Sequence, residues 1–184
     1  MTARNEPPDR WIQAYTLEDI ETLEHEHPEF GRIEIVNGAL YAGGADLGSD
    51  VHQGITFELM MLLGSLRPPG FVVRGETYWR AGPRQMLRPD VAIWAQHDRP
   101  VPEQAFQSPP MAVFEVLSRD RDHDLLTKHR IFREHGVATW YVDRRRTEGW
   151  WLGDGESVQV GDPSFELTLP GWPTVTITDA VLLG

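Results

Sequence analysis

The chain has 184 residues, no cysteine and a formal net charge of −11 at pH 7. With 40% hydrophobic and 24% charged residues, its composition is that of an ordinary globular domain with a sizeable core. The lack of cysteine excludes disulfides and thiolate-bound metals and suits a reducing compartment. The excess of acidic groups argues against indiscriminate binding to nucleic acids, because such binding depends on contacts between basic groups and phosphates.

The N-terminal residues, MTARNEPPDR, lack the apolar stretch of a signal peptide, and no apolar run approaches the roughly 20 residues of a membrane span. We therefore expect a soluble, cytoplasmic protein with no membrane segment. Residues 1–15 are expected to form a flexible arm on a single domain that comprises residues 1–184. Residues 119–146 carry eight Lys/Arg and five Asp/Glu, which leaves open either a local basic face or ordinary solvated charges.

Three segments carry helix signals: residues 16–25, 50–66 and 122–135. Thr16 and Asp19 have the spacing of a capping box at the start of the first helix. A Pro-Pro-Gly run ends the second helix, and Gly136 is the expected end of the third.

Strand signals are short segments that are either apolar or alternate between apolar and polar residues: 32–36, 39–41, 71–73, 77–80, 89–94, 111–117, 138–142, 165–169 and 174–177. The dipeptide Asn37-Gly38 between the first two is a strong hairpin signal. Together these patterns predict an α+β protein in which a mixed central β-sheet is flanked by helices.

The sixth strand contains a carboxylate where none is expected. Apart from Glu115, every residue from Met111 to Leu117 is apolar. An unpaired ionised carboxylate in such surroundings costs several kcal/mol, so it must be protonated, paired or bound to a metal.

A second carboxylate begins another apolar strand, at Pro89-Asp90-Val91. If the two strands are neighbours, Asp90 and Glu115 converge at one edge of the sheet. Mg²⁺ is commonly held by one or two carboxylates together with water and phosphate oxygens, so a metal would supply the countercharge that Glu115 needs. Taken alone, Asp90 is more simply interpreted as a turn residue at the entry to a strand.

The helix after the second of these strands contributes a lysine. At 100° per residue, Lys128 lies at the edge of the apolar face that Leu125 and Phe132 define. It therefore faces the sheet and needs a carboxylate or a functional target there. Pairing with Asp124, four residues earlier, is an equally good interpretation.

The order Pro-Asp, then a glutamate within an apolar strand, then a lysine resembles the PD-(D/E)XK nuclease superfamily. More narrowly, the chain resembles the Uma-type family of putative restriction endonucleases. The matching segments span most of the chain: Ile33–Gly38, His52, Arg88–Val91, Glu115–Ser118, Asp124–Lys128, Gly136–Val137 and Trp140–Asp143.

This resemblance implies a restriction-endonuclease-like fold and the hydrolysis of phosphodiester bonds in DNA with Mg²⁺ or Mn²⁺. Asp90, Glu115 and the main-chain carbonyl of Val116 would hold the metal, which would activate a water molecule. Lys128 would position that water or stabilise charge in the transition state. Glu34 is either a third carboxylate of the site or an exposed strand residue.

Several positions depart from the family pattern. Leu117 stands where the superfamily has its lysine, so that role would pass to Lys128 on the following helix. Phe132 replaces the usual tyrosine, and Arg119-Asp120 replaces Pro-Ser. His52 is expected to cap or satisfy a helix start, with contact to the site as the alternative.

Two other functions are compatible with these residues. The chain could be a catalytically inactive protein of nuclease fold that binds nucleic acid or a protein partner, which would suit its acidic charge. Asp90 and Glu115 could also act as the acid and base of a glycoside hydrolase, although this leaves Lys128 without a role. A homodimer would suit an enzyme that cuts both strands of a duplex.

Overall fold

The computed structural model of the chain describes seven stretches: residues 15–42, 50–96, 105–117, 123–142, 150–153, 157–159 and 165–177. Residues 1–14 of the expected arm, and the segments around Arg119-Asp120 and residues 143–149, lie outside the described residues, whereas Tyr15, the last residue of that arm, packs against a buried cluster. No helix in the described part of the chain is both long and apolar enough to cross a membrane.

A six-stranded mixed sheet forms the centre of the molecule, in the order β10-β9-β8-β7-β6-β3. Its strands are β3 (Phe71–Gly75), β6 (Val91–Ala95), β7 (Ala112–Val116), β8 (Ala138–Val142), β9 (Trp150–Gly153) and β10 (Ser157–Gln159). Only β7 and β8 pair in parallel, and the other neighbours are antiparallel. The mixed central sheet predicted from the sequence is therefore confirmed.

A smaller antiparallel sheet carries the N-terminal hairpin, in the order β2-β1-β5-β4. Its strands are β1 (Ile33–Val36), β2 (Ala39–Ala42), β4 (Trp79–Gly82) and β5 (Gln85–Leu87). The turn at Asn37-Gly38 has positive φ at both residues, 53° and 81°, as a two-residue hairpin of this kind requires. Strand β5 was not expected, because three residues are too few to show alternation.

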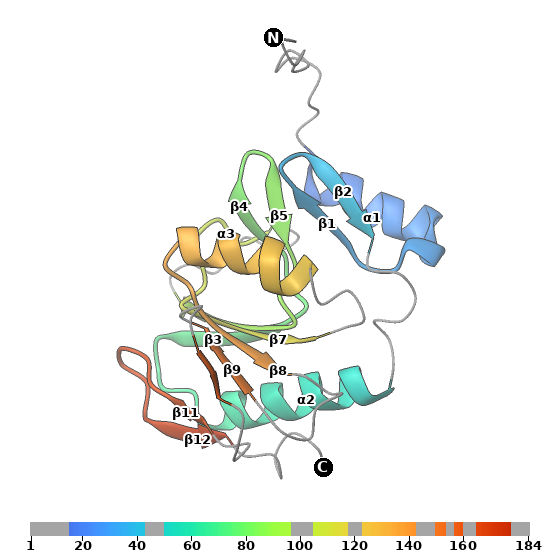
Figure 1. Cartoon of the computed structure of the whole chain (residues 1–184). Helices are drawn as coiled ribbons and strands as arrows, with labels where there is room; N and C mark the ends of the chain where they lie inside the picture. Colours follow the sequence, from blue (N-terminus) through green and yellow to red (C-terminus); the bar gives the residue numbers. More distant parts are fainter. Residues whose placement is uncertain are drawn as a thin grey trace.

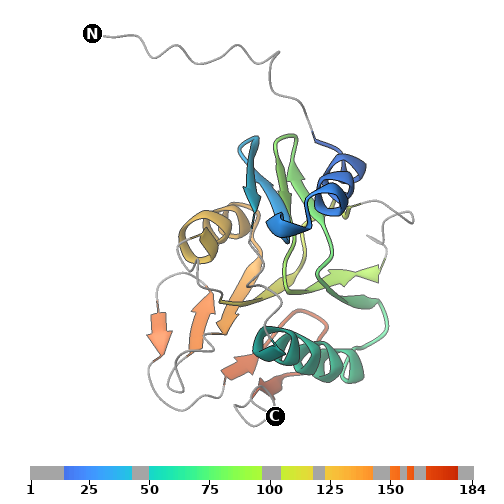
Figure 2. The ribbon, with the colours of Figure 1, turned by 90° about the vertical axis from the view of Figure 1, so that its right-hand side faces the viewer.

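The helices lie on both sides of the central sheet. In Figure 1, α2 (Asp50–Ser65) runs below the sheet and α3 (His129–Glu134) lies above it, next to the hairpins of the smaller sheet. The view in Figure 2 shows the same layers, and α1 (Leu17–Glu26) contacts β1 of the smaller sheet. Thr16 and Asp19 form the predicted capping box of α1.

The third helix differs from the prediction in its first turn. Residues His123–Lys128 form a π-helical turn, η5, and regular α-helix begins only at His129. The assumption of 100° per residue therefore does not hold for η5. Lys128 nevertheless points into the protein, where it is 1% exposed. Wide turns of this type occur often at functional sites.

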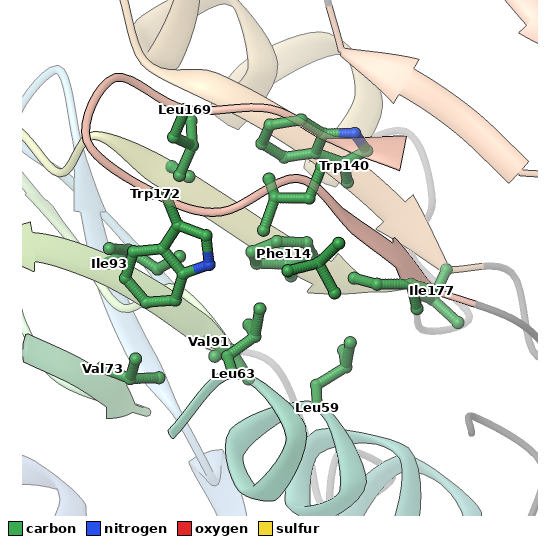
Figure 3. Close-up of a cluster of buried hydrophobic side chains, with 14 of the residues drawn as sticks. Leu59, Leu63, Val73, Val91, Ile93, Phe114, Trp140, Leu169, Trp172 and Ile177 are labelled. Atoms are coloured by element: carbon green, nitrogen blue, oxygen red, sulfur yellow. The ribbon is translucent and has the colours of Figure 1, made fainter. Parts of the chain in front are cut away.

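Two apolar layers cover the faces of the central sheet. On the lower face, Leu59 and Leu63 of α2 lie in one buried cluster with Phe114 and Trp140, and the loop between β11 (Phe165–Leu167) and β12 (Val175–Ile177) adds Trp172 (Figure 3). On the upper face, the strand side chains that alternate with those of the lower face pack against α3 and the smaller sheet. Glu115 belongs to this upper face, because it shares the orientation of Val113.

Candidate active site

Asp90 and Glu115 meet because β6 and β7 are antiparallel neighbours. Val91 lies opposite Phe114 and Ala92 opposite Val113. Continued by one residue, this register places Asp90 opposite Glu115 on the upper face of the sheet, where Cβ atoms of opposed residues are about 5 Å apart. Both side chains are 1% exposed. The two acids that the sequence predicted to converge are therefore brought together.

The Asp90 carboxylate has four donors around it. Both terminal nitrogens of Arg32 donate to Oδ1, at 2.5 and 2.6 Å. Oδ2 accepts a 2.7 Å hydrogen bond from the Val116 amide and lies 3.2 Å from Nε2 of His52. Burial alone would raise the pKa of Asp90, but Arg32 and His52 hold it well below its usual range. Asp90 is thus an ionised carboxylate whose lone pairs are all engaged.

Lys128 links three carboxylates from separate parts of the chain. Its Nζ lies 2.8 Å from Oε2 of Glu115, 3.3 Å from Oε1 of Glu34 and 3.6 Å from Oδ1 of Asp124. Burial opposes the charge of Lys128, but attraction to Glu115, Glu34 and the other acids outweighs it and raises the pKa of the ammonium group well above normal. The pairing with Asp124 and the contact with the site, which the sequence left as alternatives, are both present.

Glu34 is a buried member of this group and not an exposed strand residue; it is 5% exposed. Oε1 accepts a 2.6 Å hydrogen bond from the Arg88 amide, and Oε2 lies 3.2 Å from Nε2 of His123. Burial would raise the pKa of Glu34, but Lys128, His123 and the Arg88 amide contribute to lowering it to about 2.

Glu115 is the least satisfied of these acids. Oε2 accepts a hydrogen bond from Lys128, whereas Oε1 is buried and has no hydrogen-bond partner among the described residues. Burial raises the pKa of Glu115 well above its ordinary value, and the neighbouring Asp90, Asp124 and Glu34 raise it further against the pull of Lys128. The carboxylate that disturbs the apolar pattern of β7 is therefore paired at one oxygen and open at the other.

Sequence reasoning missed two members of the site and misjudged a third. Arg32 and His123 were not recognised as partners of the acids. For Arg32, the available sequence signal was its position two residues before Glu34, which puts both side chains on one face of the strand. No sequence signal pointed to His123. His52, expected mainly as a helix-start residue, is 1% exposed and contacts Asp90 from the first turn of α2.

The charges of this site suit a divalent cation. Among the described residues, four buried carboxyl groups surround the two cations Lys128 and Arg32, so acids outnumber cations by two: Glu34, Asp90, Glu115 and Asp124. Within the described residues, no three His, Cys, Asp or Glu side chains are arranged as a ready metal cluster. One or two carboxylates plus water and phosphate nevertheless suffice for Mg²⁺.

The available oxygens lie on one side of β7. Oε1 of Glu115 accepts no hydrogen bond from the part of the chain that the structure describes, and Asp90 lies opposite. The Val116 amide points toward Asp90, and the amide and carbonyl of one strand residue point the same way, so the Val116 carbonyl faces the same side. These residues fit a hard cation, provided that it displaces one of the four donors from Asp90.

A protein-family model matches most of the chain. A family model named Uma2, described as "Putative restriction endonuclease", matches residues 17–178. The chain belongs to the Uma2 family. The resemblance stated from the sequence is thereby confirmed at the level of the family.

A solved structure similar to this Uma2 chain is the crystal structure of a putative nuclease belonging to DUF820 from Anabaena variabilis ATCC 29413. The two chains are 19% identical, with a TM-score of 0.61, and the match covers 85% of this chain and 90% of the other. At this level of identity, the likeness establishes a shared fold. No protein with a curated description matches the chain.

Proposed function

We propose that this Uma2 protein is a metal-dependent endonuclease that hydrolyses phosphodiester bonds in DNA. The observation that supports it is the convergence of Asp90, Glu115 and Lys128 from two strands and a helix on one buried point. Membership of a family described as "Putative restriction endonuclease" points to DNA as the substrate.

In this proposal, Asp90, Glu115 and the Val116 carbonyl hold Mg²⁺ or Mn²⁺, with Glu34 close behind them. When bound, the cation supplies a water of lowered pKa and neutralises charge on the phosphate. Lys128, whose pKa is raised, stays a cation and attracts the phosphate.

The test is cleavage of DNA by purified protein in Mg²⁺ or Mn²⁺, combined with calorimetric titration of Mn²⁺. Asp90→Asn and Glu115→Gln should each abolish both cleavage and metal binding while the far-ultraviolet circular dichroism keeps the folded signal. Glu58→Gln, on the exposed face of α2, is the matched control and should behave as wild type. Cleavage that survives both site substitutions contradicts the proposal.

The saturation of Asp90 by donors favours one alternative, a catalytically inactive nuclease fold that binds nucleic acid or a protein. The same titration separates the two functions. Wild-type protein that binds no Mn²⁺ at millimolar concentration supports the inactive protein; binding that depends on Asp90 and Glu115 supports the nuclease.

We further propose that the protein is cytoplasmic and forms a homodimer, because paired sites can cut both strands of a duplex. Light scattering measures the oligomeric state.

A further inference from the structure

Tyr41 is an exposed aromatic residue at the rim of the buried site. It lies on β2, an edge strand of the smaller sheet, directly opposite Glu34 on β1. Residues opposite one another on paired strands share a face of the sheet, so Tyr41 is on the same side as the buried carboxylate. Glu34 is 5% exposed, whereas Tyr41 is 40% exposed. The pair thus connects the interior of the site with solvent.

The ring of Tyr41 is held in place by His123. The two rings are stacked, with centroids 4.5 Å apart and planes inclined by 26°. His123 in turn lies 3.2 Å from Oε2 of Glu34, and Oε1 of Glu34 lies 3.3 Å from Nζ of Lys128. A continuous series of contacts therefore fixes the orientation of Tyr41 relative to Lys128.

An exposed aromatic residue on an edge strand needs no ligand by itself. Tyr41 differs from its neighbour Leu40, which is 45% exposed but projects from the other face of β2, away from Glu34. Flat exposed rings that are oriented in advance are the groups on which proteins stack nucleobases, and such stacking is tolerant of base identity. It also requires no positive charge, which suits a chain of net charge −11.

We infer that Tyr41, supported by His123, is a stacking subsite for an unpaired nucleobase next to the phosphate that is cut. The inference rests on the proposed nuclease function and narrows its substrate. Bases inside a duplex are stacked on one another, so a base can reach Tyr41 only from single-stranded DNA, an overhang or a flipped nucleotide. The preferred substrate is therefore DNA with an unpaired stretch.

The experiment uses a short single-stranded DNA that contains 2-aminopurine, whose fluorescence is quenched when it stacks. Binding is measured to the full chain with metal withheld, so that no cleavage is involved. Wild type and Tyr41→Phe should quench the probe with similar affinity. Tyr41→Ala should lose the quenching and bind at least about fivefold more weakly, the effect expected for one base–aromatic stack. Leu40→Ala, equally exposed on the opposite face, should match wild type.

Several results overturn the subsite: quenching and affinity in Tyr41→Ala equal to wild type, an equal loss in Leu40→Ala, or tighter binding of a blunt duplex than of the single strand. The outcome for cleavage is separate. Tyr41-dependent quenching without any cleavage in Mg²⁺ or Mn²⁺ supports the subsite and refutes the nuclease. Metal-dependent cleavage with the same KM in Tyr41→Ala refutes the subsite and leaves the nuclease standing.

Discussion

The Nζ atom of Lys128 lies 2.8 Å from Oε2 of Glu115, and both side chains are 1% exposed. This ion pair is what allows a carboxylate to remain in the apolar strand β7. A buried ion pair is not in itself strong evidence of stability, because desolvation of the two charges offsets their attraction. Removal of one partner, however, leaves the other charge buried without compensation.

Lys128→Met should therefore lower the free energy of unfolding by about 3–5 kcal/mol. Glu115, Glu34 and Asp124 would remain buried around a neutral side chain. The double variant with Glu115→Gln should recover part of this loss, since it removes one of the uncompensated charges. Urea denaturation followed by circular dichroism measures all three free energies.

A nearby surface pair provides the control for this measurement. Arg130 and Glu134 are 4.0 Å apart, and their side chains are 60% and 58% exposed. Arg130→Ala should cost less than about 1 kcal/mol. If Lys128→Met costs as little as Arg130→Ala, or if Glu115→Gln fails to restore stability, then Lys128 does not compensate the buried acids.

The sequence predicted the members of this pair because each violates a local pattern. Glu115 interrupts an apolar strand, and Lys128 lies on the apolar side of a helix. Their meeting could also be inferred, since the family resemblance gives the order of the motifs. The resemblance did not give the partner of each oxygen, which depends on tertiary contacts.

Arg32 and the π-helical turn mark the limit of such reasoning. Arg32 begins the predicted strand at residues 32–36 and shares a face with Glu34, but an arginine there violates no pattern, and its partner Asp90 lies 58 residues later. The π turn at His123–Lys128 has no signature in residue spacing, although its two buried members, Asp124 and Lys128, pair with each other inside the protein. Hairpin chemistry, by contrast, is local, and Asn37-Gly38 was sufficient to predict it.

Glu34 should make stability depend on acid pH. Its pKa is lowered from 4.5 to about 2 in the folded protein, so the ionised form stabilises the fold at pH values above 4.5. That contribution is on the order of 3 kcal/mol. It is lost as the pH falls from 4.5 to about 2, because in this range Glu34 binds a proton in the unfolded state but not in the folded state, so that added protons favour unfolding.

Glu34→Gln cannot titrate and should therefore lack this loss. The difference in unfolding free energy between wild type and Glu34→Gln should be largest above pH 4.5 and should shrink toward pH 2, as measured by urea titrations at a series of pH values. A difference that is independent of pH would show that Glu34 is not held ionised by Lys128 and His123.

A side chain at position 38 should destabilise the protein, whereas a side chain at position 64 should stabilise it. Gly38 has a φ of 81° in the turn that aligns Glu34 with Tyr41, so Gly38→Ala should cost about 1–2 kcal/mol. Gly64 lies in α2 with open space around it, and Gly64→Ala should stabilise the protein by about 0.5–1 kcal/mol. Thermal unfolding compares the two; equal signs would contradict the left-handed turn at Gly38.

Arg32 should compete with a divalent cation for Asp90. Its guanidinium donates twice to Oδ1 of Asp90, and its only other carboxylate partner among the described residues within 4.0 Å is Glu76, at 3.5 Å and 43% exposed. Because the lone pairs of Asp90 are all engaged, a cation must displace a donor, and Arg32 carries the charge that the cation would replace.

Arg32→Gln should therefore be less stable than wild type without metal, yet bind Mn²⁺ about tenfold more tightly, a change of about 1.4 kcal/mol. Its melting temperature should rise more on addition of Mn²⁺, because a ligand that binds only the folded state stabilises in proportion to its affinity. Calorimetry and thermal unfolding measure the two effects, with the exposed Arg84→Gln as control. Weaker Mn²⁺ binding by Arg32→Gln would reverse the conclusion, since Arg32 would then hold Asp90 in place for the cation.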